Sequence, residues 1–254
     1  MKKDAYSQSV IFSCEHGGNK IPRKYQAFFQ DAKEALHSHR GWDPGAKRVA
    51  EDLAQIWNAP VFSSEVSRLL VDLNRSENHP ACFSEFSRNL DPERKEEILE
   101  THYRPYRREV ENWLTLAVRR NRVFHFSIHS FTPELYGEVR NCEIGLLYDP
   151  QSTLERKTSR ELKVLFKKFF PELRVRMNYP YKGYLDGFTT KLRRDFNRNR
   201  YSGIEIELNQ TLMEKLKESR KRLMFSKTLA HCLADAVSIV EETQPLKRKP
   251  RGNP

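Results

Sequence analysis

The chain has 254 residues, of which 38% are hydrophobic and 31% are charged, and its formal net charge is +11 at pH 7. This composition excludes a disordered chain and indicates a folded protein with a heavily charged surface. No apolar run approaching the roughly 18 residues of a membrane span is apparent, and no apolar signal core follows the charged N-terminus. A cytoplasmic protein without a membrane partner is therefore expected.

The length suits one large domain or two small ones. We assign residues 1–242 to a single catalytic domain and residues 243–254, which are basic and contain prolines, to a disordered tail. No nucleic-acid motif accompanies the positive charge, so nucleic acid is not the expected partner. A basic protein that binds polyanions remains an alternative.

The first half of the chain alternates between strand and helix patterns. Residues 8–14 predict a buried strand, and residues 24–37 predict a helix. Residues 43–58 also predict a helix, because Asp43 can cap it and Pro44 fits its first position. Further expectations are one or two strands within 60–75, a loop over 76–98 and a helix over 102–121.

The second half continues this alternation. The expected strands are 122–130, 141–149 and 202–210, the expected helices are 152–170, 188–199 and 218–241, and 173–181 is expected to be extended. Strands that alternate with helices predict an α/β fold, in which helices cover both faces of a mixed or parallel sheet.

Ionisable and polar side chains gather where predicted apolar runs end. These residues are Glu15 and His16; Asp72, Asn74 and Arg75; His125 and His129; and Glu205 and Glu207. In an α/β sheet such ends meet at one edge, where ligands bind, and histidines with carboxylates can form a metal site there. Gly17 and Gly18, which follow the first strand, are expected to supply positive φ angles.

Several of these residues also have a structural interpretation. His16 and His129 are either metal ligands or hydrogen-bonded structural residues, and His125 is interpreted as structural. His39 could join the site. The segment 72–75 is either a surface turn with an internal salt bridge or a clamp for a substrate carboxylate, because arginine binds carboxylates through two hydrogen bonds.

Glu207 lies in an apolar strand, where a carboxylate is costly unless it is paired or has a chemical task. Glu205 shares its face, so the pattern does not choose between them. Cys14 lies two residues from His16, but nothing local would lower its pKa, and we assign it to packing. The four cysteines form no CxxC pair and are expected to be reduced.

Six motifs follow one another along the chain: CEHGGNKIP, HRGWDPGA, SRLLVDLNR, FSIHSFTP, YPYKGYLDG and GIEIELNQ. Together they resemble the N-formylglutamate amidohydrolase family over about residues 9–212. This family is thought to share its architecture with zinc carboxypeptidases and aspartoacylase. The resemblance therefore implies a mixed central sheet with helices on both faces, and one Zn²⁺ per chain.

The resemblance also implies the metal ligands. His16 and His129 match the two zinc-ligand histidines. Carboxypeptidase-like enzymes supply a Glu three residues after the first histidine, but here Asn19 occupies that position and is a poor zinc ligand. We prefer Asp43, which begins the DPGA segment, as the third ligand, with Glu15 as the alternative. A plain helix cap is an equally good interpretation of Asp43.

The remaining roles follow from the same resemblance. Glu207 matches the glutamate that activates water, and Arg68 matches an arginine that polarises the scissile carbonyl. Asn74 and Arg75 match the pair that holds the substrate carboxylate. The sequence therefore predicts a catalytic pair and a carboxylate-binding pair in addition to the metal ligands.

The implied activity is zinc-dependent hydrolysis of the amide of an N-formyl or N-acyl amino acid, with N-formyl-glutamate the best match. The partner would be a small molecule that carries a carboxylate, and Lys182 and Tyr184 would shape its pocket. Alternatives are an enzyme for another N-acyl amino acid or a short peptide and, because of Asn19, a non-catalytic homologue that binds a ligand. The oligomeric state is left open.

Overall fold

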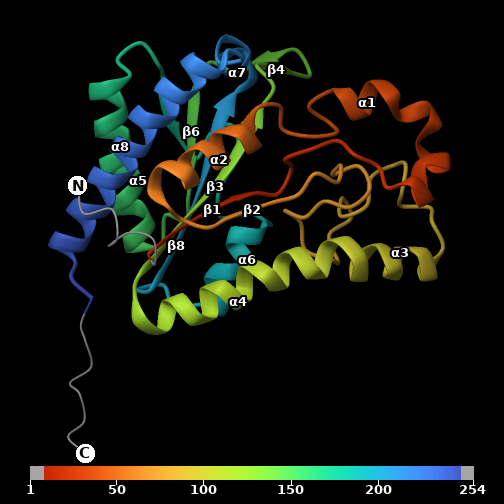
Figure 1. Cartoon of the computed structure of the whole chain (residues 1–254), viewed down its shortest axis with the longest axis horizontal. Helices are drawn as coiled ribbons and strands as arrows, with labels where there is room; N and C mark the ends of the chain where they lie inside the picture. Colours follow the sequence, from red (N-terminus) through yellow and green to blue (C-terminus); the bar gives the residue numbers. More distant parts are fainter. Residues whose placement is uncertain (1–8, 247–254) are drawn as a thin grey trace, which may run out of the picture.

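The computed structural model describes residues 9–246 and contains a six-stranded central sheet (Figure 1). The strand order is β2-β1-β3-β8-β6-β7. These strands are β1 (Val10–Cys14), β2 (Val61–Ser63), β3 (Val123–Phe131), β6 (Ile144–Leu147), β7 (Val175–Met177) and β8 (Tyr201–Asn209). All neighbouring pairs are parallel except β6 and β8, which are antiparallel. The expected mixed sheet is confirmed.

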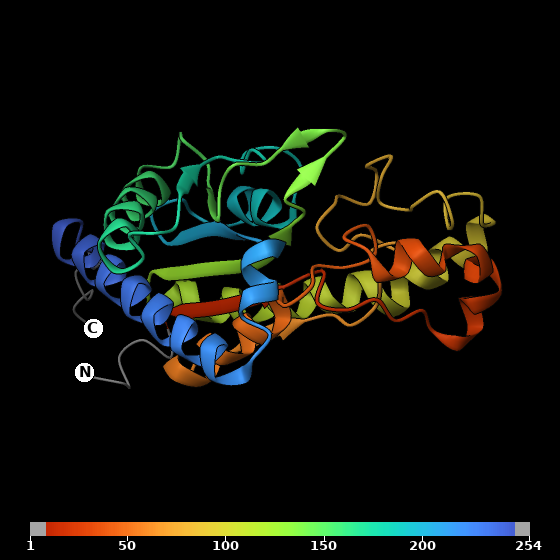
Figure 2. The same cartoon turned by 90° about the horizontal axis from the view of Figure 1, so that it is seen from above.

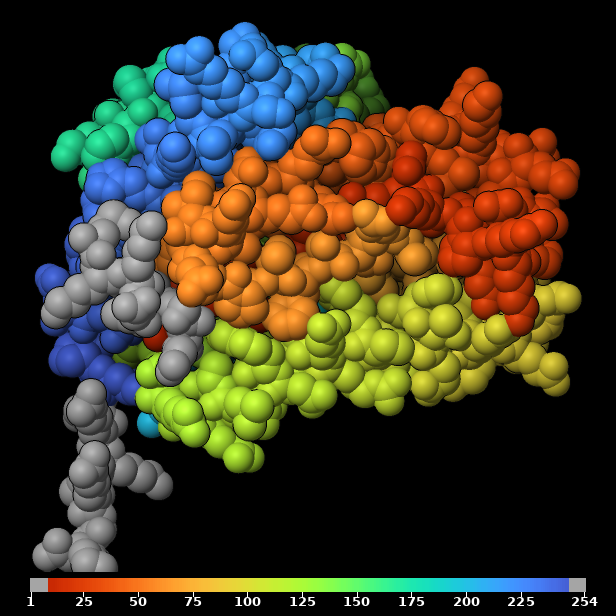
Figure 3. Space-filling view, in the orientation of Figure 1, coloured from red at the N-terminus to blue at the C-terminus, as the bar shows by residue number. Residues whose placement is uncertain are grey.

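Helices cover both faces of this sheet, as expected. α2 (Ala46–Trp57), α5 (Thr153–Phe169) and α8 (Ser219–Thr243) pack on one face, while α4 (Arg104–Arg120) and α6 (Phe188–Asp195) pack on the other (Figures 1 and 2). Figure 3 shows the orange segment that includes α2 between the blue C-terminal helices and the yellow-green α4. Each face has its own hydrophobic cluster, because parallel strands are buried on both sides.

A lobe extends from one side of the sheet, beyond the end of β1 (Figure 2). It contains η1 (Arg23–Ala32), α1 (Lys33–His37), α3 (Pro92–Ile98) and the π-helical η2 (Leu99–Tyr103), which continues into α4. The remaining elements are α7 (Gln210–Lys215) and the hairpin of β4 (Glu134–Leu135) and β5 (Glu138–Val139). The sequence analysis did not predict α7 or this hairpin.

Of the two expectations for residues 60–98, that of one or two strands within 60–75 is confirmed and that of a loop over 76–98 is wrong. The first part contains only the short β2, and Asp72 then begins a turn in which its Oδ1 accepts from the backbone N–H of Asn74 at 2.9 Å. The second part contains α3, because Asp91 caps it and Pro92 occupies its first position. Residues 72–75 therefore lie in a turn and not at the end of a strand.

The helix-cap interpretation of Asp43 is also wrong. α2 begins at Ala46, and its N-cap is Gly45, whose φ of 84° is in the left-handed region that favours glycine. Asp43 forms no cap hydrogen bond, and its Oδ2 instead accepts from the backbone N–H of Ser130 at 3.2 Å. Its carboxylate therefore faces the end of β3.

Gly17 and Gly18 do not adopt positive φ angles. They are required because the backbone after β1 passes very close to the segment after β2. A Cβ atom on Gly17 would lie 2.8 Å from the carbonyl oxygen of Ser64, and one on Gly18 would lie 2.5 Å from that of Glu65. This close approach fixes the backbone that follows His16.

α8 is long and apolar enough to cross a membrane by length and composition alone, so the expectation of no such segment is wrong. Half of the most apolar stretch of α8 is buried inside the protein. Leu229, Leu233 and Val237 belong to the same hydrophobic cluster as residues of α2 and α5. α8 ends at Thr243, and residues 247–254 of the expected tail lie outside the described part of the chain.

His125 is completely buried in β3 and joins neighbouring strands through hydrogen bonds. Its Nε2 lies 2.7 Å from the Ser13 hydroxyl, and its Nδ1 lies 2.8 Å from the Tyr201 hydroxyl. Burial lowers the pKa of His125 to about 4. A neutral imidazole offers one donor and one acceptor, which fits these two hydroxyl partners and a structural role.

This burial predicts a defined pH dependence of stability. The unfolded chain binds a proton at His125 below about pH 6.5, whereas the folded chain does so only near pH 4. Stability from this group is present above pH 6.5 and falls by about 3 kcal/mol as pH drops through that window. Urea unfolding between pH 7 and 4 should show a weaker pH dependence in His125→Gln than in the wild type.

The exposed His231 on α8 offers the matched control, and His231→Gln should retain the wild-type slope. An unchanged slope in His125→Gln would contradict a neutral, buried His125.

Candidate metal centre and substrate cavity

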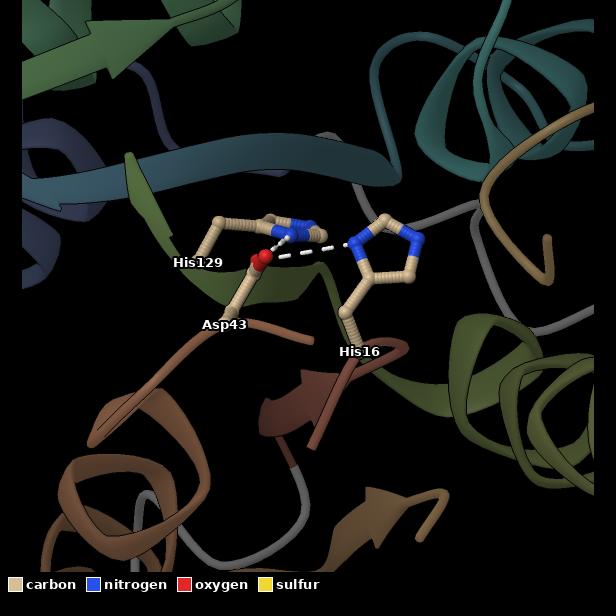
Figure 4. A group of neighbouring side chains, drawn as sticks. All are labelled: His16, Asp43 and His129. Carbon is tan, nitrogen blue, oxygen red and sulfur yellow. Dashed lines mark hydrogen bonds and ion pairs between the residues drawn. The ribbon is translucent and has the colours of Figure 1, made fainter. Parts of the chain in front are cut away.

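His16, Asp43 and His129 converge at the carboxyl edge of the sheet. His16 follows β1, Asp43 precedes α2, and His129 lies near the end of β3. All three side chains are buried, and candidate ligand atoms from each lie within 4.8 Å of one another. Figure 4 shows both imidazole rings beside the Asp43 carboxylate. Chain segments far apart in sequence thus bring two nitrogens and an oxygen together.

Both histidines direct Nδ1 toward Asp43 (Figure 4). The Nδ1 atom of His129 lies 2.9 Å from Asp43 Oδ2, and that of His16 lies 3.5 Å from the same oxygen. The His16 Nδ1 atom is buried and has no hydrogen-bond partner within residues 9–246. Buried polar atoms in folded proteins rarely lack a partner, and atoms that bind a metal ion are among the exceptions.

The second nitrogen of each ring is held by a carboxylate. His16 Nε2 lies 2.7 Å from Asp72 Oδ1, and His129 Nε2 lies 3.1 Å from Glu15 Oε2. Metal-binding histidines commonly have this arrangement, since a partner on one nitrogen orients the ring and leaves the other nitrogen for the metal. The arrangement therefore supports Nδ1 as the ligand atom of both histidines.

Glu15 and Asn19, the other residues considered for the third ligand, do not join this cluster. Besides contacting His129, the Glu15 carboxylate accepts hydrogen bonds from Tyr106 and Ser127. The Asn19 amide donates to a backbone carbonyl of α1. Among these candidates, Asp43 lies with the histidines, in agreement with the preferred assignment.

The cluster stabilises its own charged forms. Burial opposes protonation of His129, but Asp43 and Glu15 raise its pKa well above the ordinary value. Burial also opposes protonation of His16, and Asp72 and Asp43 more than offset it, so that its pKa is raised. The two histidines in turn hold the pKa of Asp43 below its usual range, although burial acts in the opposite direction. A divalent cation bound here would replace protons on the imidazoles.

Glu207 faces the cluster from the neighbouring strand. The register of β3 and β8 pairs it with His129, and its Oε2 is buried without a hydrogen-bond partner in the described chain. Burial raises the pKa of Glu207 to about 7. Glu205 differs, because its carboxylate accepts a hydrogen bond of 2.5 Å from the Thr189 hydroxyl. The two glutamates share a face, but Glu207 retains the free oxygen that a proton-transfer group needs.

A cavity of about 180 Å³ opens onto these groups. Its wall includes the cationic side chains of Arg68, Arg75 and Lys182 and four carboxylates, those of Asp43, Asp186, Glu205 and Glu207. The cavity therefore presents both cationic and acidic groups to a small molecule. Tyr181 lines the cavity, whereas Tyr184 lies in a separate depression, so the structure does not bring Tyr184 to the predicted pocket.

Arg68 is linked to the cluster through Asp72. Its Nε and Nη2 atoms donate to Asp72 Oδ2 at 3.2 and 2.7 Å, while Asp72 Oδ1 contacts His16. The sequence pattern predicts a turn or a substrate clamp at Asp72 and does not predict this bridge. The contact between Asp72 and His16 spans 56 positions and leaves no local signal.

Asn74 and Arg75 line the cavity from the turn that follows Asp72. The Asn74 side-chain oxygen accepts from the backbone N–H of Phe188 at 2.7 Å, which ties this turn to the start of α6. Arg75 donates through Nη1 to the carbonyl oxygen of Asp186 at 2.9 Å. These contacts fix the position of both residues and leave further Arg75 donors for a ligand.

The buried His–Asp–His cluster lies opposite a glutamate at the carboxyl edge of an α/β sheet, where such sheets commonly bind ligands. The sequence profile of the N-formylglutamate amidohydrolase family matches residues 8–213. The chain therefore belongs to this family and is an amidohydrolase. This match confirms the resemblance seen in its motifs.

Two solved structures have a similar fold. Gene product Atu2144 from Agrobacterium tumefaciens is 28% identical, with a TM-score of 0.78 over 92% of each chain. N-formylglutamate amidohydrolase from Ralstonia eutropha JMP134 is 14% identical, with a TM-score of 0.66 over 92% of this chain and 94% of that chain. The second likeness is one of fold alone. No curated protein sequence matches the chain significantly.

The geometry of the cluster predicts how zinc affinity responds to substitution. His16→Ala and His129→Ala should each abolish tight zinc binding, because each removes a ligand nitrogen. Asp72→Asn should weaken zinc binding by about 10- to 100-fold, since it leaves the ring of His16 in place but removes the charge behind it. Competition with a chromophoric chelator measures all three.

His231→Ala, on the exposed face of α8, is the control and should bind zinc like the wild type. Equal zinc affinity in all four variants would show that this cluster is not the metal site.

Proposed function

We propose that the protein is a metal-dependent amidohydrolase that cleaves the amide of an N-formyl or N-acyl amino acid, with N-formyl-glutamate the best match. The observation that carries the proposal is the unpartnered Nδ1 of His16, which lies beside Asp43 and His129 at the cavity. Membership of the family supports the reaction class.

The donor set of this cluster fits zinc. Catalytic zinc sites commonly have three protein ligands drawn from histidine and carboxylate, and they keep one position open for water or substrate. His16, Asp43 and His129 would supply these ligands. When bound, zinc would polarise the scissile carbonyl and increase the acidity of a water molecule.

Glu207 would transfer the proton. Burial raises its pKa above the ordinary value of a glutamate, which suits a group that accepts a proton from the attacking water and returns it to the leaving nitrogen. Its Oε2 atom has no hydrogen-bond partner in the described chain, so this oxygen can bind the proton. Arg68, which lines the same cavity, would donate hydrogen bonds to the oxygen that becomes negatively charged in the transition state.

Arg75 would hold the substrate carboxylate. A guanidinium group binds a carboxylate through two parallel hydrogen bonds, and the anchor on Asp186 fixes its position in advance. Asn74 would add a donor from its amide nitrogen, and Lys182 would add positive charge at the mouth. Binding at this point, away from the scissile bond, would orient the amide for attack.

The size of the cavity favours this function over that of a peptidase. About 180 Å³ lies below the usual range for drug-sized ligands and suits a single amino acid derivative. A non-catalytic homologue was suggested by Asn19, but Asp43 supplies a carboxylate without it. A different N-acyl amino acid would use the same residues and remains the second candidate. The cytoplasmic location stays a prediction.

Glu207→Gln should reduce kcat for N-formyl-glutamate by about 100-fold or more while zinc content stays unchanged, because the amide keeps the shape but cannot accept the proton. Glu205→Gln is the matched control on the same strand face, and its effect should be much smaller. Steady-state kinetics with metal analysis on the same samples make the comparison.

Loss of zinc in Glu207→Gln would make Glu207 a ligand instead of a base. If Glu205→Gln were inactive while Glu207→Gln remained active, Glu205 would be the residue that accepts the proton.

Arg75→Ala should raise KM for N-formyl-glutamate by about 10- to 100-fold, the loss expected for a charged hydrogen-bonded contact of about 1.5–3 kcal/mol. The same variant should process an N-formyl amine without a carboxylate as well as the wild type does. Arg88→Ala changes an exposed arginine and serves as the control. Equal losses on both substrates would rule out a carboxylate contact by Arg75.

A further inference from the structure

We propose that a second cavity, between α4 and α6, binds a small organic molecule through an oxyanion group, independently of the catalytic cavity. Its volume is about 330 Å³, within the usual range of small-molecule sites. Tyr103, Arg107 and Lys191 line it, and Lys191 links the two helices through Glu111 at 2.7 Å. Asp186 lines both this cavity and the catalytic one, so the two are neighbours.

The central feature of this cavity is a buried arginine without an acidic partner. Arg107 is 4% exposed, and it forms no ion pair with any residue in the range 9–246. Burial of a charge is costly unless the charge is paired. Arg193 on α6 is similarly buried but forms an ion pair, in which its Nε lies 2.8 Å from Glu155. Arg107 has no acidic partner in the described chain, and it lines a cavity in which an anionic ligand could supply one.

The contacts of Arg107 within the described chain use only one edge of its guanidinium. Its Nη1 donates to the carbonyl oxygens of Arg75 and Leu73, at 2.6 and 3.3 Å, and to the Tyr103 hydroxyl. Its Nε and Nη2 atoms form no hydrogen bond with the described residues. These two atoms make up one edge of the planar group, and together they match the two oxygens of a carboxylate or phosphate.

Two aromatic rings hold this guanidinium in place. Its central carbon lies 4.8 Å from the ring centre of Tyr103 and 4.3 Å from that of Phe188. Such cation–π contacts fix the plane of the group, so the donors need little reorganisation when a ligand binds.

The other charged groups leave the cavity positive. Five cationic side chains line it against three carboxylates, of which Glu77 pairs with Arg104 and Glu111 with Lys191, while Asp186 accepts hydrogen bonds from Ser76. Arg194 also lines the cavity and has no ion pair within the described chain. Arg107 and Arg194 therefore remain as the cations available to an anionic ligand.

Isothermal titration of the zinc-loaded protein with succinate and, separately, with inorganic phosphate tests the proposal. At least one probe should bind, and Arg107→Lys should weaken that binding by about 10-fold or more, because it keeps the charge but removes the planar pair of donors. Arg194→Gln, an exposed substitution that does not threaten folding, should also weaken it. The probe that binds identifies the oxyanion as carboxylate or phosphate.

Two controls separate this site from other cationic surfaces. Arg119→Gln changes an exposed arginine of α4 outside the cavity and should bind the probe like the wild type. Lys182→Gln weakens only binding in the catalytic cavity, so the binding that depends on Arg107 should remain in it. Absence of binding at about 10 mM of either probe would overturn the proposal. So would binding that is lost in Lys182→Gln but retained in Arg107→Lys and Arg194→Gln.

Discussion

The register between β3 and β8 is the constraint on which the site depends. It pairs Ser127 with Glu205 and His129 with Glu207, so that all four point to the same face of the sheet. A shift of one residue would turn each side chain to the opposite face. That opposite face is apolar in both strands and packs against α2, α5 and α8. The hydrophobic core therefore enforces the register that brings the polar groups together.

Charge around the histidines is arranged in layers. Asp43 lies between the two Nδ1 atoms, while Asp72 and Glu15 hold the outer nitrogens. Burying so many charges costs free energy that their mutual attraction offsets only in good geometry. Such a network is better explained by a chemical role than by stability, and a site of this kind needs rigid support. The backbone N–H of Ser130 supplies part of it, because it donates a hydrogen bond to the Asp43 carboxylate.

The sequence predicted the parts of this arrangement that have a local signal. Alternation over 122–130 and 202–210 located β3 and β8, and the motif resemblance selected His16, His129 and Glu207 for roles that await experiment. The apolar residues near Leu70 suggested a strand but pack beneath a turn, because burial alone does not distinguish the two. Asp72 and Arg107 act through partners 56 and 32 positions away, and no local pattern encodes such contacts.

The most direct test of the account is anomalous diffraction at the zinc edge from crystals of the zinc-saturated protein. The account predicts one strong peak per chain, bonded to Nδ1 of His16, Nδ1 of His129 and the carboxylate of Asp43, with Asp72 and Glu15 still in contact with the outer nitrogens. A peak bonded through Nε2, a peak at another cluster, or no peak in saturated crystals would contradict it.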